Sequence, residues 1–332
     1  MIISRTPFRV SFFGGGTDYP AWYQENTGAV LATSIDKYCY VICGYLPPFF
    51  DHKYRIVYSR NEMVKSLDEI RHPAVREILR YFKIEKGVSV QHVGDLPARS
   101  GIGSSSAFTV GLLHALYALV GKLVSKRQLA TEAIKIEQQK MRENVGSQDQ
   151  VSAAFGGFNK IRFWGKGKFQ VEPVPLLPEK LNAFQSHFLL YFTGFSRLAT
   201  EIAGEQIQRI PQKRKELLRM REMVDEALEI LNDDRCSYER FGKLLHEAWL
   251  IKRTLSSKIT TSTIDEIYRK ARRAGATGGK LIGAGGGGFM LFFAPPERQA
   301  GVRRAMRSFL RVPFKFDDQG SQIVYYRPDT HF

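Results

Sequence analysis

Apolar and polar residues alternate with a period of two along much of the first third of the chain. This is the period of β-strands, in which successive side chains point to opposite faces. The strand-like runs cover residues 1–13, 28–46, 53–59 and 87–93. Cys39 and Cys43 fall in the second run, so we expect both thiols to point to one face and to pack in the core. With no histidine beside them, they make a poor zinc site.

A helical period follows the strands. Residues 104–120 and 126–143 place apolar side chains three and four positions apart, which predicts two amphipathic helices. We expect the serines at 104–106 to cap the first helix and Ser125 to cap the second.

The second half of the chain mixes both periods. Prolines mark a linker-like stretch at residues 171–182, and strands are predicted at 187–194, 278–294 and 321–327. Residues 196–274 are mostly helical, with a break expected at Pro211, a capping box at Thr263 and Glu266, and a stop at Gly275. This organisation predicts an α+β protein of two domains, at residues 1–175 and 182–332.

Composition is that of a folded soluble protein. Of the 332 residues, 43% are apolar and 25% are charged, which is ordinary for a folded protein. The longest apolar run, residues 107–121, contains His114 and is too short to span a bilayer. Arg5 and Arg9 interrupt the apolar start of the chain, and the odd number of cysteines argues against a disulfide framework. We therefore expect a cytoplasmic enzyme.

The net charge of +16 changes this picture only in part. Such a charge is compatible with binding to nucleic acid, to an anionic membrane surface or to small anionic substrates. The basic residues are spread over segments that also read as amphipathic helices, which favours solvated helix faces. Charge alone does not identify the partner.

Candidate chemistry begins with "PARSGIGSSSAF", residues 97–108. Gly101 and Gly103 let the backbone approach an anion, and the serines open a helix whose free amides and positive end attract phosphate. Serine hydroxyls also suit a magnesium ion bound to nucleotide phosphates. The alternative is a glycine turn followed by ordinary serine capping. No Lys-Ser or Lys-Thr pair closes the glycine run, so the segment is not a P-loop.

Two carboxylates follow on the next segments. Glu137 falls in the middle of the apolar side of the predicted helix 126–143, where it needs a cation or hydrogen-bond donors. Magnesium and an internal salt bridge are equally compatible with that position. Asp149, in "GSQDQ", could accept a proton from an attacking hydroxyl, although the pattern alone favours a helix-capping aspartate.

Two glycine-rich stretches lie at opposite ends of the chain. "SFFGGGTDYP", residues 11–20, resembles a phosphate loop, but Asp18 would repel a phosphate. "KLIGAGGGGFMLFF", residues 280–293, holds four consecutive glycines, whose entropic cost is justified by close backbone packing or by packing against a phosphate loop.

In order and separation, Arg5, Pro7 and Arg9 with "GGGTD", then "GIGSSSA", then "GAGGGG" resemble the three motifs of the GHMP kinase superfamily. The resemblance implies an amino-terminal α/β nucleotide-binding domain, a ferredoxin-like carboxy-terminal domain, and ATP with Mg²⁺ bound between them.

The resemblance also implies roles for individual residues. Arg9 and Asp149 would be catalytic, as cation and base. Residues expected to bind the sugar are Gly15, Gly16, Thr17, Asp18 and Arg197. Residues expected to bind ATP are Arg99, Gly101, Gly103, Ser104, Ser105 and Ser106. Metal ligands would be Ser104, Ser105 and Glu137. Lys37, Arg99, Arg197 and Lys280 are candidates for a substrate phosphate, with plain surface charge as the alternative.

Within the superfamily, "RVSFFGGGTDYP" is similar to sugar 1-kinases of the galactokinase type, which carry a charged or polar pair where this chain has Gly15 and Gly16. Longer stretches resemble bacterial D-glycero-D-manno-heptose 7-phosphate kinases. This implies a small sugar phosphate and ATP as partners, without nucleic acid or membrane, and leaves a homodimer open. Two alternatives stay open as well: a 1-kinase of an unphosphorylated sugar such as fucose, galactose or arabinose, and a non-catalytic nucleotide-binding regulator.

Overall fold

Two β-sheets organise the molecule. The computed structural model describes residues 1–194, 199–233 and 237–328. Within these residues the first sheet has the strand order β13-β1-β2-β5-β3-β4. Strands β6 and β12 also pair with β2, and β7 pairs with β6. Its strands are β1 (Ile2–Phe13), β2 (Gly28–Tyr45), β3 (Tyr54–Val57), β4 (Asn61–Val64), β5 (Val88–Gly94), β6 (Phe158–Trp164), β7 (Lys168–Pro173), β12 (Phe316–Asp317) and β13 (Gln322–Tyr326). Among the strand pairs that the described residues form in this sheet, only β3–β5 is parallel.

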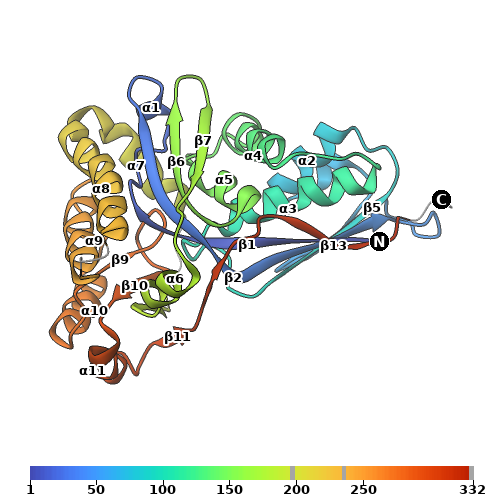
Figure 1. Cartoon of the computed structure of the whole chain (residues 1–332). Helices are drawn as coiled ribbons and strands as arrows, with labels where there is room; N and C mark the ends of the chain where they lie inside the picture. The colour runs from blue at the N-terminus through green and yellow to red at the C-terminus, as the bar shows by residue number, and fades with distance from the viewer. Residues whose placement is uncertain (195–198, 234–236, 329–332) are drawn as a thin grey trace.

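A helical layer covers one face of this sheet, as Figure 1 shows. It consists of α2 (Pro73–Phe82), α3 (Ser104–Leu119), α4 (Lys126–Lys135) and α5 (Gln148–Phe155), with the short α1 (Pro20–Tyr23) and the 3-10 turn Leu67–Glu69 nearby. Helix α3 packs on β1 and β2 while α2, α4 and α5 surround it, so it is apolar and buried on nearly all sides.

The second sheet has the strand order β11-β8-β10-β9, and every pair in it is antiparallel. Its strands are β8 (Phe188–Phe192), β9 (Gly278–Leu281), β10 (Phe289–Phe293) and β11 (Leu310–Val312). Between β8 and β9 run α7 (Ala199–Arg209), the 3-10 turn Ile210–Lys213, α8 (Arg214–Asn232), α9 (Glu239–Lys252) and α10 (Ser262–Arg273). The turn Pro296–Arg298 and α11 (Gln299–Ala305) connect β10 to β11. This order confirms the predicted ferredoxin-like arrangement.

The end of the chain returns to the first sheet. Strand β13 pairs antiparallel with β1, and the Arg327 amide donates to the Met1 carbonyl, so the end of β13 lies beside the first residue of the chain (Figure 1). The predicted boundaries at 1–175 and 182–332 stay a prediction, but a division by sheets assigns the last two strands to the first unit.

Aromatic side chains join the two sheets. Phe12 from β1 stacks on Phe188 from β8 with ring centroids 5.0 Å apart, and Phe184 and Phe241 lie edge-on to the same cluster. All four are buried, and each buries a large apolar area. The β1 end that carries the glycine run is therefore fixed against the second sheet.

Most predicted elements are confirmed, and local signals account for the misses. The expected linker contains helix α6 (Pro178–Gln185), because Pro178 suits the first turn of a helix. The predicted helix 126–143 is α4 followed by a π-helical turn, Ile136–Lys140. Thr261, and not Thr263, caps α10 through the Ile264 amide. Ser125 caps α4, and the break at Pro211 and the stop before Gly275 are confirmed.

The surroundings of the two cysteines and the lengths of the helices follow from this fold. Cys39 and Cys43 are both buried with free thiols, as predicted. In the described parts of the chain, every helix is too short or too polar to cross a bilayer.

His114 on α3 connects the helical layer to the returning end of the chain. Its Nδ1 lies 3.0 Å from Ser321 Oγ, and burial lowers the pKa of His114 to about 4.

Because the pKa of His114 is depressed in the folded protein, the stability that neutral His114 contributes is complete above pH 6.5 and is lost as the pH falls through 4. We expect His114→Gln to reduce the acid-induced loss of unfolding free energy between pH 6.5 and 4, by at most about 3 kcal/mol. Thermal unfolding at several pH values measures this, and parallel curves for both proteins would contradict it.

Candidate functional site

Two glycine-rich loops from distant parts of the chain lie in direct contact. A Cβ on Gly101 would stand 2.4 Å from the Ile282 carbonyl oxygen, and one on Gly283 would stand 2.5 Å from the Gly101 Cα. Both glycines have positive φ, and the Phe289 amide donates to the Ser100 carbonyl at 3.2 Å. The prediction that the four-glycine stretch packs backbone against the phosphate-type loop is confirmed.

The start of α3 differs from the expectation in one respect. Gly103, in a left-handed conformation, occupies the N-cap, and no serine side chain caps the helix. Ser104 Oγ accepts instead from the Arg99 amide at 3.1 Å, while Ser105 is exposed and Ser106 is buried. The first amides of α3 thus lack a side-chain cap, and they form the kind of helix end that binds anions.

Arg9 and Asp149 form a fork at this helix end. Arg9 Nε donates to Asp149 Oδ1 and Nη2 to Oδ2, both at 2.8 Å, and Nη1 donates to the Gly101 carbonyl at 2.6 Å. The Arg9 side chain is 5% exposed and that of Asp149 is 26% exposed, so the carboxylate is the accessible member. A Cβ on Gly103 would touch both side chains, at 3.3 and 3.4 Å. Asp149 lies in the first turn of α5 after the N-cap Ser147, so the capping alternative is not what the structure shows.

The loop at residues 14–18 holds Asp18 close to this pair. Asp18 is buried, accepts from the amides of Gly16 at 3.1 Å and Gln148 at 3.3 Å, and its pKa is raised by burial and by the charge of Asp149. The Thr17 hydroxyl donates to the carbonyls of Gly14 and Ala29 within the loop. Thr17 thus has a structural role, and its predicted contact with a sugar stays a prediction.

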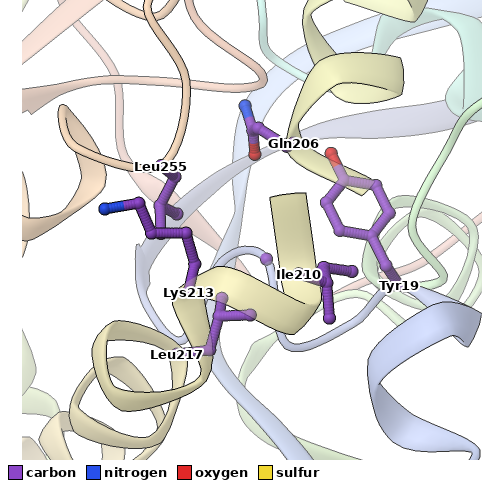
Figure 2. A pocket seen from close by; sticks show the side chains of 7 residues that line it. Tyr19, Gln206, Ile210, Lys213, Leu217 and Leu255 are labelled. Atoms are coloured by element: carbon purple, nitrogen blue, oxygen red, sulfur yellow. The ribbon is translucent and has the colours of Figure 1, made fainter. Parts of the chain in front are cut away.

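A small cavity opens beside the same loop. Gly16 lines it together with the residues that Figure 2 labels: Tyr19, Gln206, Ile210, Lys213, Leu217 and Leu255. Gly15 has open space where a side chain would stand. The cavity therefore adjoins the loop at which the sugar is predicted.

Glu137 is completely buried at the π-helical turn after α4. Its Oε2 accepts from Ser106 Oγ at 2.8 Å and from Gln150 Nε2. Among the described residues Oε1 makes no hydrogen bond of good geometry, although the Thr109 hydroxyl is close enough to lower the pKa of Glu137. Burial raises the pKa of Glu137 to about 7, against the hydrogen bonds that lower it. A hydroxyl and an amide, and not the alternative salt bridge, thus hold this carboxylate.

A divalent cation fits this donor set. The Glu137 carboxylate beside the Ser106 hydroxyl of α3 offers the oxygen ligands that Mg²⁺ prefers. Within the described ranges, no group of three His, Cys, Asp or Glu side chains forms a complete site by itself, so nucleotide phosphates and water would have to supply further ligands.

The four candidates for binding a substrate phosphate differ in their surroundings. Arg197 lies outside the described residues. Lys37 pairs with Asp36 at 2.8 Å, and Arg99 is exposed with a positive φ. For Lys280 the surface-charge alternative is wrong, because this lysine is buried and donates to the Phe12 carbonyl at 2.8 Å, and its predicted contact with a substrate phosphate stays a prediction.

Sequence reasoning missed Lys252 altogether. This residue is 7% exposed, and its Nζ donates to the carbonyls of Leu281 at 2.9 Å and Gly283 at 2.5 Å. Its position on the apolar side of α9, with Phe241, Leu245 and Trp249, is the signal that could have revealed it.

Comparisons with known proteins place this geometry in context. The model of the GHMP kinases N terminal domain matches residues 68–157, and that of GHMP kinases C terminal matches residues 234–312, together about half of the chain.

Relatives extend this match over the whole chain. The D-glycero-alpha-D-manno-heptose 7-phosphate kinase of Campylobacter jejuni is 27% identical over 92% of this chain and 93% of that protein. The bifunctional fucokinase/GDP-fucose pyrophosphorylase of Arabidopsis thaliana is 25% identical over 94% of this chain and 31% of its own length. A crystal structure of a D-glycero-D-manno-heptose 1-phosphate kinase from Bacteroides thetaiotaomicron has the same fold, with a TM-score of 0.80 at 22% identity over 98% of this chain and 99% of that one.

Proposed function

This chain belongs to the GHMP kinases, and on that premise we propose that it transfers the γ-phosphoryl group of ATP to the anomeric hydroxyl of a phosphorylated sugar. The proposed substrate is D-glycero-D-manno-heptose 7-phosphate and the product heptose 1,7-bisphosphate, for nucleotide-activated heptose and surface polysaccharide synthesis. The Campylobacter jejuni relative supports this sugar, because the similarity spans nearly the whole of both chains.

The observation that carries the proposal is the fork between Arg9 and Asp149 at the start of α3. Asp149 is accessible enough to orient an attacking hydroxyl and to accept its proton. Arg9 holds that carboxylate in place with two hydrogen bonds, and its charge also stabilises the negative charge of the transferred group. A binding module without catalysis has no need for such a pair.

The nucleotide phosphates would bind at the start of α3. The first amides of the helix, with Gly101 and Gly103 in the preceding loop, offer donors without a Cβ in the way. Mg²⁺ bound there would offset the negative charge of the phosphates. Glu137 with Ser104 and Ser105 are the proposed ligands, and the contact with Glu137 adds the Ser106 hydroxyl to this set.

The sugar would lie against the loop at residues 14–18, on the open side at Gly15, because the adjoining cavity is too small to hold it (Figure 2). Asp18, Gly15 and Gly16 are the proposed contacts, because a carboxylate suits sugar hydroxyls and the glycines leave room for the ring. Arg197 is proposed to hold the sugar phosphate. A homodimer and a cytoplasmic location stay predictions.

A second candidate is a 1-kinase of an unphosphorylated sugar of the fucose type. The observation that favours it is the Arabidopsis thaliana relative, which matches 94% of this chain.

A panel of sugars and sugar phosphates with an ADP-release assay distinguishes the two candidates. We expect kcat/KM for D-glycero-D-manno-heptose 7-phosphate to exceed that for fucose, galactose or arabinose by at least about 100-fold, because a doubly charged phosphate adds charge-assisted hydrogen bonds. Equal activity on a free sugar would favour the second candidate. ADP release with none of these compounds would refute both.

A further inference from the structure

Two buried lysines lie beside the proposed active site and take no part in the chemistry described above. Lys252 comes from the last turn of α9, and Lys280 comes from β9. Both are nearly inaccessible, at 7% and 4% exposure. Burying an ammonium group costs free energy unless its N–H donors are hydrogen-bonded. The hydrogen bonds of each lysine therefore indicate which part of the structure it stabilises.

Lys252 binds the backbone where β9 ends. Its Nζ donates to the carbonyls of Leu281 and Gly283, on either side of Ile282. The Ile282 carbonyl is the atom against which Gly101 of the α3 loop packs. Lys252 therefore fixes the segment that supports the proposed nucleotide loop.

Lys280 binds a different loop. Its Nζ donates to the carbonyl of Phe12, and β1 is irregular at this residue because Ser11 pairs with Ala32 while Phe13 pairs with Leu31. An irregularity of this kind leaves a residue outside the ladder and redirects the strand. Lys280 satisfies a carbonyl at the point where β1 turns into the loop of Gly14 to Asp18.

The charges of this region also act on each other. Burial lowers the pKa of Lys252 to about 7, the charge of Arg9 lowers it further and that of Asp18 opposes the shift. The pKa of Lys280 is lowered by burial and then by the charges of Lys252 and Arg9. Both lysines are thus close enough for their charges to interact with that of the catalytic Arg9. An apolar side chain of similar size would have no such effect on Arg9.

We propose that Lys252 and Lys280 are positioning residues with separate tasks: Lys252 holds the nucleotide loop in place, and Lys280 holds the sugar loop in place. The assignment of each loop to its substrate rests on the function proposed above. The contacts that hold each loop do not depend on that function.

Hydrogen–deuterium exchange of the intact protein tests the contacts without any substrate. We expect Lys252→Met to accelerate exchange about 10-fold or more in residues 97–104 and 281–289, and Lys280→Met to do so in residues 11–18. Lys126→Met is the matched control, since Lys126 at the start of α4 also donates to a backbone carbonyl, that of Phe155 at the end of α5. Faster exchange of both loops in both variants, or of neither loop, would overturn the proposal.

Binding and kinetics test the consequence for each substrate. With Mg²⁺ and a nonhydrolysable ATP analogue, Lys252→Met should raise Kd about 10-fold, and Lys280→Met should leave it within about twofold. With D-glycero-D-manno-heptose 7-phosphate, the KM should rise for Lys280→Met and not for Lys252→Met. A loss of kcat without this division would indicate a merely structural role and overturn the proposal.

Glutamine variants and the substrate-independent measurements cover two cases in which the methionine variants or the heptose phosphate give no result. Should a methionine variant fail to fold, Lys252→Gln and Lys280→Gln retain a side-chain donor and should show the same division with smaller effects. Should the wild-type protein not use the heptose phosphate, the function proposed above fails, while exchange and nucleotide binding still decide the roles of the two lysines.

Discussion

Asp149→Asn is expected to lower kcat by about 10²- to 10⁴-fold and to leave the Kd for ATP within about twofold. Asparagine keeps the shape of the side chain and one acceptor oxygen for Arg9, but it cannot accept the proton of the sugar hydroxyl. The nucleotide phosphates are proposed to bind the α3 amides and glycines, which the substitution leaves in place. Steady-state ADP release and a direct nucleotide-binding titration measure the two quantities separately.

The control for this prediction is Asp68→Asn, which removes an exposed aspartate that pairs with Arg80. It should change neither kcat nor the Kd for ATP. Unchanged turnover in Asp149→Asn would remove Asp149 from the mechanism. A parallel loss of ATP binding and turnover would instead indicate that the Arg9–Asp149 fork holds the α3 loop, because Arg9 also donates to the Gly101 carbonyl.

Local sequence signals predicted most of the fold because they depend on short-range physics. Strand alternation and helical periodicity record which faces are buried, and the strands and helices expected from them are present. The caps were less predictable. At α3 a left-handed glycine takes the N-cap in place of a serine, and at α10 a threonine two positions earlier takes the place of the expected one. Neighbouring candidates compete there, and tertiary packing selects among them.

The candidate site was predictable as a set of residues but not as a set of contacts. Arg9 and Asp149 were assigned complementary roles from motif resemblance, yet their pairing across 140 positions depends on how α5 packs on β1. Glu137 was found because a charged residue interrupted an apolar helix face. The same reasoning applies to Lys252 on α9, where the surrounding charged residues concealed it.

Lys280 gave no such signal. It lies in a four-residue strand that is buried throughout, so no alternation identifies an inward face. Its partner is a backbone carbonyl at an irregularity of β1, and a carbonyl has no sequence identity. Contacts of side chains with irregular backbone therefore emerge only from the tertiary structure.

Glu137→Gln is expected to weaken Mg²⁺-dependent ATP binding on the order of 100-fold, because the proposed ion loses its only carboxylate ligand from the chain. Binding of ATP measured without Mg²⁺ should change much less. The fold should tolerate the substitution, since glutamine has the same size and can accept from Ser106 Oγ. The Gln150 carboxamide oxygen, buried without a partner among the described residues, could accept from the new amide after the Gln150 carboxamide rotates.

Glu132→Gln is the matched control for this substitution. Glu132 lies on α4, five residues before Glu137, and accepts from the Tyr117 hydroxyl at 2.8 Å. It should leave the Mg²⁺ dependence of ATP binding unchanged. Titrations of a nonhydrolysable ATP analogue at several Mg²⁺ concentrations, together with thermal unfolding, separate an ion ligand from a structural residue. If Glu137→Gln lowers only the unfolding temperature and keeps full Mg²⁺-dependent binding and turnover, the buried carboxylate serves the packing between α3 and α4 and the ion binds elsewhere.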